Sequence, residues 1–221
     1  MDALVEKLLE SPKLPELIDE LQARMSEERA RRERFYNEIT EDQKAEFING
    51  EVIVHSPNKI RHLEVRDNLH TLLRAFVQTR RLGFVAGEKA LCVFPRNDYE
   101  PDVCYFNPGK AGQLAPNQLK LPVPDFIAEV LSDSTAQTDR GQKFRDYQAH
   151  GVQEYWIIDP DQQILEQYIR KGEAYELLQK SATGEVRSLT VPGFSIPVRA
   201  LFDVQVQLQF LRKMLEPEGT A

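Results

Sequence analysis

The spacing of apolar residues divides the chain into helical and strand segments, and it changes sharply near residue 47. Between residues 14 and 25, apolar positions recur every three or four residues, which predicts an amphipathic helix. Residues 26–34 are mostly charged and carry no apolar stripe of their own. We therefore expect the first 46 residues to form a helical extension that packs on the body of the protein or on a second subunit.

After this extension, apolar and polar residues alternate, as they do in a half-buried strand. The Asn49-Gly50 dipeptide predicts a tight turn between two short strands. Residues 60–80 then return to helical spacing. At about 100° per residue, His62 falls within the apolar stripe of this helix, and Glu64 falls on the opposite side.

The remainder of the core places a helix between strands. Predicted strands cover residues 84–94, 102–106, 126–131, 154–159, 164–169 and 174–178, and predicted helices cover residues 139–150 and 204–215. Residues 192–197 are expected to form a loop over the sheet edge. Strands on both sides of a helical crossover form a mixed α/β sheet with helices on its faces. We expect this core over residues 47–202 and a C-terminal helix and tail over residues 203–221.

Composition and charge exclude several classes of protein. Apolar residues make up 41% of the chain and charged residues 29%, as in a soluble globular protein. The apolar runs are too short to cross a bilayer, and the first residues lack a signal-peptide pattern. The two cysteines are too few for a disulfide framework, and their spacing does not indicate a zinc site. We therefore expect a cytoplasmic protein. The net charge of −7 argues against a strongly basic nucleic-acid binder. A local basic strip over residues 59–81 is either a solvated helix face or a phosphate-binding surface.

Glu129 interrupts the otherwise apolar strand 126–131. An unpaired buried carboxylate costs on the order of several kcal/mol, so Glu129 needs either an arginine or backbone donor, or a metal ion. Asp102 opens a neighbouring strand after Pro101, where it either caps a turn or brings a second carboxylate to the same end of the sheet. Two converging carboxylates suit Mg²⁺ or Mn²⁺, which prefer oxygen ligands.

Lys143 is the third candidate for chemistry. It lies in the predicted helix 139–150, on the same stripe as Asp139 and Tyr147. It is either a surface lysine or an ammonium group directed at the two carboxylates. In the second case it would orient a water molecule or stabilise negative charge on a phosphate group.

The order of these motifs resembles that of one known family. The motifs are Pro101-Asp102, Glu129-Val-Leu-Ser, Asp139-x-x-x-Lys143 and Glu154-Tyr-Trp-Ile-Ile-Asp. Over about residues 45–202 their succession resembles the Uma-type restriction endonuclease family of the PD-(D/E)XK nuclease superfamily. The resemblance implies a restriction-endonuclease-like fold and a Mg²⁺ or Mn²⁺ ion held by Asp102, Glu129 and the carbonyl of Val130. It also implies that Lys143 is catalytic.

Two positions depart from the superfamily pattern. The lysine of the Glu-x-Lys motif would fall at position 131, which is Leu131 here, and Lys143 resembles a lysine that has migrated to the following helix. Many members of the superfamily carry a glutamate on the first core helix. The glutamate in that helix here is Glu64, but its helical phase directs it away from the sheet, whereas His62 is directed toward the sheet. We therefore expect His62 beside the site, with Glu51 and Glu88 as candidates for an extra acidic ligand.

The resemblance implies a metal-dependent endonuclease that hydrolyses DNA phosphodiester bonds. Arg66 and Lys59 are then the expected phosphate-binding residues. A homodimer is expected because the terminal helices add amphipathic surface and because duplex cleavage suits two symmetric sites. Two other functions remain open: a catalytically inactive nuclease-fold module for binding or regulation, and a metal-dependent phosphoesterase that acts on a small molecule. The sequence does not distinguish DNA from RNA or reveal a target sequence.

Overall fold

A mixed sheet lies at the centre of the computed structural model, which describes residues 3–40 and 42–216. Among these residues six strands form the sheet, in the order β10-β9-β8-β7-β6-β3. They are β3 (Phe84–Gly87), β6 (Val103–Phe106), β7 (Phe126–Val130), β8 (Glu154–Asp159), β9 (Ile164–Lys171) and β10 (Ala174–Ser181). Neighbouring strands are antiparallel except β7 and β8, which are parallel. This confirms the predicted mixed α/β sheet.

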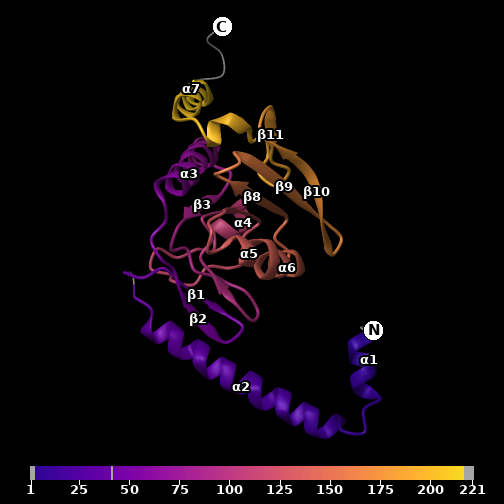
Figure 1. Cartoon of the computed structure of the whole chain (residues 1–221). Helices are drawn as coiled ribbons and strands as arrows, with labels where there is room; N and C mark the ends of the chain where they lie inside the picture. The colour runs from indigo at the N-terminus through magenta and orange to yellow at the C-terminus, as the bar shows by residue number, and fades with distance from the viewer. Residues whose placement is uncertain (1–2, 41, 217–221) are drawn as a thin grey trace.

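Helices cover both faces of this sheet (Figure 1). Helix α3 (Ile60–Arg80) packs on one face, with η2 (Val198–Leu201) and α7 (Val204–Leu215) beside it. The segments α5 (Ala136–Thr138), η1 (Asp139–Lys143) and α6 (Phe144–Ala149) connect β7 to β8 across the other face. Side chains alternate between the two cores, because Val103 and Tyr105 of β6 face α3 whereas Cys104 and Phe106 face α6.

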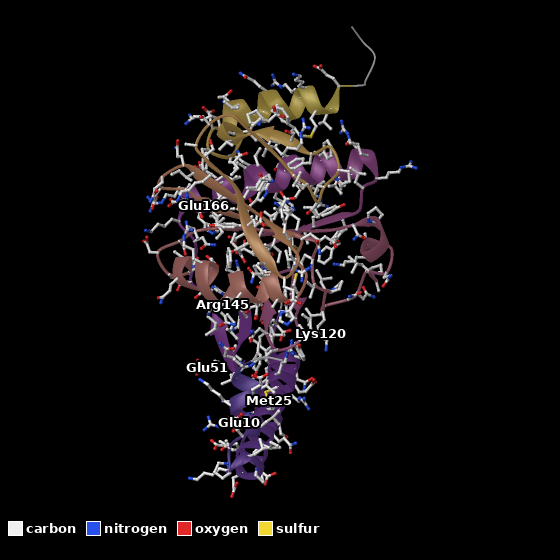
Figure 2. All side chains as sticks on the ribbon, turned by 90° about the vertical axis from the view of Figure 1, so that its right-hand side faces the viewer. Glu10, Met25, Glu51, Lys120, Arg145 and Glu166 are labelled. Atoms are coloured by element: carbon white, nitrogen blue, oxygen red, sulfur yellow. The ribbon has the colours of Figure 1, made fainter. Side chains whose placement is uncertain are left out.

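A second, smaller sheet joins the body to the N-terminal helices. Its order is β2-β1-β5-β4, and its strands are β1 (Ala45–Ile48), β2 (Glu51–Val54), β4 (Cys92–Val93) and β5 (Asp98–Tyr99). The predicted Asn49-Gly50 turn joins β1 to β2, with φ angles of 51° and 87°. The second half of α2 (Leu14–Glu38) packs on this sheet through Phe35, whereas α1 (Ala3–Leu9) and the first half of α2 project beyond it (Figures 1 and 2).

Three predicted elements differ from the observed ones. The expected strand 84–94 is two strands, β3 and β4, in different sheets, because the chain reverses between them with Lys89 at a φ of 68°. The expected loop 192–197 ends in β12 (Ser195–Pro197), which pairs with β11 (Glu185–Arg187). The first strand begins at Ala45 rather than at residue 47, so Glu46 belongs to the sheet.

The loop 107–124, between β6 and β7, contains only the short helix α4 (Pro108–Ala111). In the part of the chain that the structure describes, no helix is long and apolar enough to cross a membrane.

Candidate active site

Asp102 and Glu129 lie opposite each other at one end of the central sheet. The pairing of Val103 with Ala128 in the antiparallel β6–β7 ladder places the preceding residue, Asp102, across from Glu129 on the face that α6 covers. The Asp102 amide donates to Glu129 Oε2 at 3.2 Å, and the Val130 amide donates to Asp102 Oδ2 at 2.9 Å. Both carboxylates are buried. The structure therefore brings together the two residues expected to hold a metal.

Lys143 reaches this pair from a π-helical turn. The helix expected over residues 139–150 instead begins at Ala136, ends at Ala149 and is not uniform, because the π-helical turn η1 lies between α5 and α6. Within this turn the side chains of Asp139 and Lys143 are both buried, and their Oδ1 and Nζ atoms lie 3.4 Å apart. Lys143 Nζ also lies 3.0 Å from Glu129 Oε1. The turn therefore directs one cation and one carboxylate into the same site.

Glu46 is a fourth buried carboxylate that the sequence reasoning missed. Its Oε1 lies 2.9 Å from Lys143 Nζ and its Oε2 lies 3.0 Å from His55 Nε2. The neighbours Ala45 and Phe47 are buried on the side of α2, so Glu46 faces the opposite side of its strand. A charged residue between two apolar ones at the start of an alternating segment is the signal that could have identified it.

Donors from three further residues complete the cluster. Lys44 Nζ lies 3.2 Å from Asp102 Oδ1, and His62 Nε2 lies 3.1 Å from Asp102 Oδ2. The Tyr147 hydroxyl donates to Glu129 Oε1 at 2.8 Å. His62, which was expected beside the site, is buried against Asp102.

Carboxyl groups outnumber ammonium groups in this cluster. Four carboxyl groups (Glu46, Asp102, Glu129 and Asp139) face two ammonium groups (Lys44 and Lys143), so acidic side chains outnumber the ammonium groups by two among the described residues. The four carboxyl groups differ in their pKa, which is lowered for Glu46 and Asp102 and raised for the other two. Burial opposes ionisation of Glu46, but Lys143 and His55 outweigh it and lower its pKa to about 2. Burial also opposes the charge on Asp102, but His62 and Lys44 hold its pKa well below the usual range.

The pKa values of the other two carboxyl groups, Glu129 and Asp139, are raised. Burial is the main cause that raises the pKa of Glu129 to about 8, and the nearby charges of Asp139 and Asp102 add to it despite Lys143. Burial likewise raises the pKa of Asp139. Without an additional cation, this site therefore favours a protonated carboxyl group at neutral pH.

A small cavity lies among these groups. Its volume is about 20 Å³, which is room for one water molecule or ion. It is lined by Lys44, His55, Asn58, His62, Asp102, Glu129, Thr135, Asp139 and Lys143. Asp139 Oδ1 is buried and accepts no hydrogen bond from the residues that the structure describes.

A hard divalent cation suits this donor set. The carboxylate oxygens, the excess of acidic side chains over ammonium groups and the unsatisfied Asp139 Oδ1 are the features that Mg²⁺ or Mn²⁺ would complement. Among the described residues no three acidic, histidine or cysteine side chains already stand as ligands of one ion. The oxygens of Asp102 are instead occupied by Lys44, His62 and the Val130 amide, so a bound ion would displace at least one of these donors.

The remaining candidate residues lie outside this cluster. Glu88 pairs with Arg66, and Arg66 also lies 2.8 Å from Asp67, so neither reaches the cavity. Glu51 is exposed on β2. Lys59 is exposed and pairs with Asp133 at 2.6 Å. The phosphate-binding roles of Lys59 and Arg66 stay predictions.

Comparisons with known proteins agree with this fold. The family model Uma2, described as "Putative restriction endonuclease", matches residues 31–199. An uncharacterized protein of Synechocystis sp. is 32% identical over 139 residues, which cover 62% of this chain and 77% of the relative. A crystal structure from Anabaena variabilis, described as a putative nuclease belonging to DUF820, superposes with a TM-score of 0.66 at 20% identity and covers 78% of this chain and 96% of its own. The chain therefore belongs to the Uma2 family of restriction-endonuclease-like proteins.

Proposed function

We propose that this protein is a metal-dependent endonuclease that hydrolyses DNA phosphodiester bonds. The observation that supports the proposal most strongly is the buried cluster of Asp102, Glu129 and Asp139 around a cavity of one-ion size, with the Lys143 ammonium group at its wall. Membership of a family described by restriction endonuclease activity agrees with this chemistry.

Asp102, Glu129 and Asp139 are the side chains that would hold the ion, with the Val130 carbonyl as a further proposed ligand. A bound Mg²⁺ or Mn²⁺ supplies an activated water molecule and neutralises charge on the phosphate. The remaining residues position these groups. Tyr147 donates to Glu129 and fixes the orientation of its carboxylate, and His62 does the same for Asp102.

Lys143 is the proposed group that acts on the substrate. Its ammonium group is buried and held by three carboxylates, so it stays protonated, and these carboxylates raise its pKa above the usual value although burial opposes this. A fixed cation at the cavity wall can donate a hydrogen bond to a non-bridging phosphate oxygen as negative charge develops there. Lys59 and Arg66 remain the proposed contacts to flanking phosphates.

Cleavage of supercoiled plasmid DNA tests this proposal. We expect the wild-type protein to nick or linearise the plasmid with Mg²⁺ or Mn²⁺ and to leave it intact with a chelator. Asp102→Asn should abolish cleavage, whereas Glu176→Gln, on an exposed carboxylate of β10, should not change it. A protein that binds the plasmid but never cuts it under any of these conditions would contradict the proposal and favour a catalytically inactive binding module of the same fold.

A further inference from the structure

A second, larger cavity adjoins the one-ion cavity. Its volume is about 350 Å³, and it lies between the β1–β2 hairpin and the segment that carries α5 and η1. The two cavities share the side chains of His55, Thr135, Asp139 and Lys143. In Figure 2 the hairpin that carries Glu51 lies below the helix that carries Arg145, and the cavity lies in this part of the molecule. A group bound here would therefore be a direct neighbour of a group bound beside Lys143.

The walls of this larger cavity combine apolar surface with neutral hydrogen-bonding groups. Ile48, Ile53 and Val54 supply the apolar surface from the hairpin. The neutral polar side chains are Asn49, Ser56, Ser134, Thr135, Thr138 and Gln142. The His55 imidazole provides a flat ring of the kind on which bases stack. Such a lining suits a flat heterocycle with several donors and acceptors.

The charges of the lining disfavour a phosphate group in the same space. Glu46, Glu51 and Asp139 are acidic, and among the described lining residues Lys143 is the one with a permanent positive charge. The Lys143 ammonium group already faces three carboxylates. An anion would meet net repulsion here, whereas an uncharged ligand would not.

We propose that this cavity binds one unpaired nucleobase of the DNA, next to the phosphodiester that is cleaved. This inference rests on the proposed endonuclease function and names the form of its substrate. The volume is at the lower end of the range for small-molecule sites, about 300–1,000 Å³, and suits one base rather than several. A base that is stacked and paired within a duplex cannot insert between the hairpin and the helical segment, so the preferred substrate is single-stranded or carries an unpaired nucleotide.

Residue Ile53 provides the direct test, and Val52 provides a matched control. Ile53 pairs with Glu46 in the hairpin and lines the cavity, whereas Val52 pairs with Phe47 on the other face of the strand and does not line it. Both side chains are exposed to solvent, at 38% and 49%, so a larger residue can be accommodated at either position. A tryptophan at position 53 fills the cavity, and a tryptophan at position 52 leaves it open.

Binding is measured in the presence of a chelator, so that no cleavage occurs, with short fluorescein-labelled oligonucleotides in single-stranded and duplex form. We expect the wild type to bind the single strand about tenfold more tightly than the duplex, as one stacked base implies. Ile53→Trp should remove most of this preference and Val52→Trp should keep it. A 2-aminopurine base in the single strand should increase in fluorescence on binding to the wild type and not on binding to Ile53→Trp.

The outcomes separate this inference from the proposed function. Equal affinity for both forms, or an Ile53→Trp variant with unchanged affinity, would overturn the base-binding proposal even if plasmid cleavage is intact. A single-strand preference that depends on Ile53, in a protein that cuts no DNA with either metal, would retain the base site and contradict the endonuclease. Glu51→Trp, which fills the same cavity from an exposed position on the same face of β2, replaces Ile53→Trp if thermal melts show that the latter is unfolded.

Discussion

At the scale of single residues, Glu129 distinguishes a metal site from a structural ion pair. Its pKa of about 8 means that the metal-free protein favours the protonated carboxyl group at pH 7. A glutamine has nearly the same shape as this neutral form. The response of the protein to Glu129→Gln therefore reveals whether the negative charge of Glu129 stabilises the metal-free fold or serves to bind a cation.

Glu129→Gln should change the free energy of unfolding of the metal-free protein by less than about 1 kcal/mol, because the charge that it removes is disfavoured by burial. Mn²⁺ should raise the melting temperature of the wild type by mass action, and this rise should be lost in the variant. Calorimetric melts with and without Mn²⁺ measure both effects. A loss of about 3–5 kcal/mol in the variant, together with a wild type that does not respond to Mn²⁺, would show that Glu129 is only an ion-pair partner of Lys143.

Lys143→Ala should have a different signature. Removing a buried cation leaves Glu46, Glu129 and Asp139 without a shared partner, which should cost about 3–5 kcal/mol of stability. The variant loses one positive charge from the site, so Mn²⁺ should raise the melting temperature of this variant more than that of the wild type. Plasmid cleavage should nevertheless stay low. An Mn²⁺ effect no larger than that of the wild type would contradict this assignment of charges.

At the scale of secondary structure elements, Glu166 ties three segments together. This buried residue of β9 pairs with Arg140 of η1 at 2.7 Å and with Lys180 of β10 at 2.8 Å. Burial opposes its charge, but Arg140, Lys180 and Tyr168 outweigh burial and lower its pKa to about 2. The π-helical turn that carries Lys143 is thereby anchored to the central sheet.

The lowered pKa of Glu166 predicts a pH-dependent contribution to stability. Because the folded state holds the charged form, the contribution is present above the ordinary pKa of 4.5 and disappears as the pH falls toward about 2. Arg140 and Lys180 are partly exposed, so solvent reduces the contribution to about 1–2 kcal/mol. Glu166→Gln should lose this amount at pH 7 and little at pH 2. Chemical denaturation at the two pH values measures it, and equal losses at both would contradict the ion-pair origin.

The elements also show what sequence reasoning could and could not reach. The apolar strand 126–130 with one interior glutamate, and the Pro-Asp before a neighbouring strand, sufficed to pair Asp102 with Glu129, because adjacent antiparallel strands fix the register. The π-helical turn was not predictable, because periodicity over so few residues does not separate a wide turn from an α-helix. Glu46 was missed because its ammonium partner, Lys143, lies far away in sequence on η1, and nothing in the local pattern links Glu46 to His55 after β2.

At the scale of the whole molecule, the N-terminal arm (residues 3–25) contains no buried residue and extends away from the body. In Figure 2 the arm carries Glu10 and Met25 away from the body. Its exposed apolar side chains are Leu4, Val5, Leu9, Ile18, Leu21 and Met25. The second half of α2, by contrast, is fixed to the body by ion pairs from Glu28 to Arg96 and from Arg32 to Asp98. The family model begins at residue 31, so the arm lies outside the matched region.

We propose that the arms of two copies cover each other in a homodimer. Light scattering at micromolar concentration should give the full chain the mass of a dimer. The Leu21→Glu variant should have the mass of a monomer, because it places a charge in the exposed apolar stripe of the arm. Leu177→Glu, on the exposed face of β10, should remain dimeric. A monomeric wild type would remove this proposal and leave the site assignments unaffected.

The ion pair between Glu46 and Lys143 has a consequence for how the protein is made. Its two members lie far apart in the sequence, with Asp102 and Glu129 between them. Contacts of this separation slow folding, since the entropy of closing a long loop opposes them. A nascent chain on the ribosome therefore has no assembled cluster until the crossover segment has emerged and docked. A chain truncated before Lys143 still carries Glu46, Asp102 and Glu129 but lacks the Lys143 ammonium group and the rest of the crossover segment, so it should neither bind metal at this site nor cut DNA.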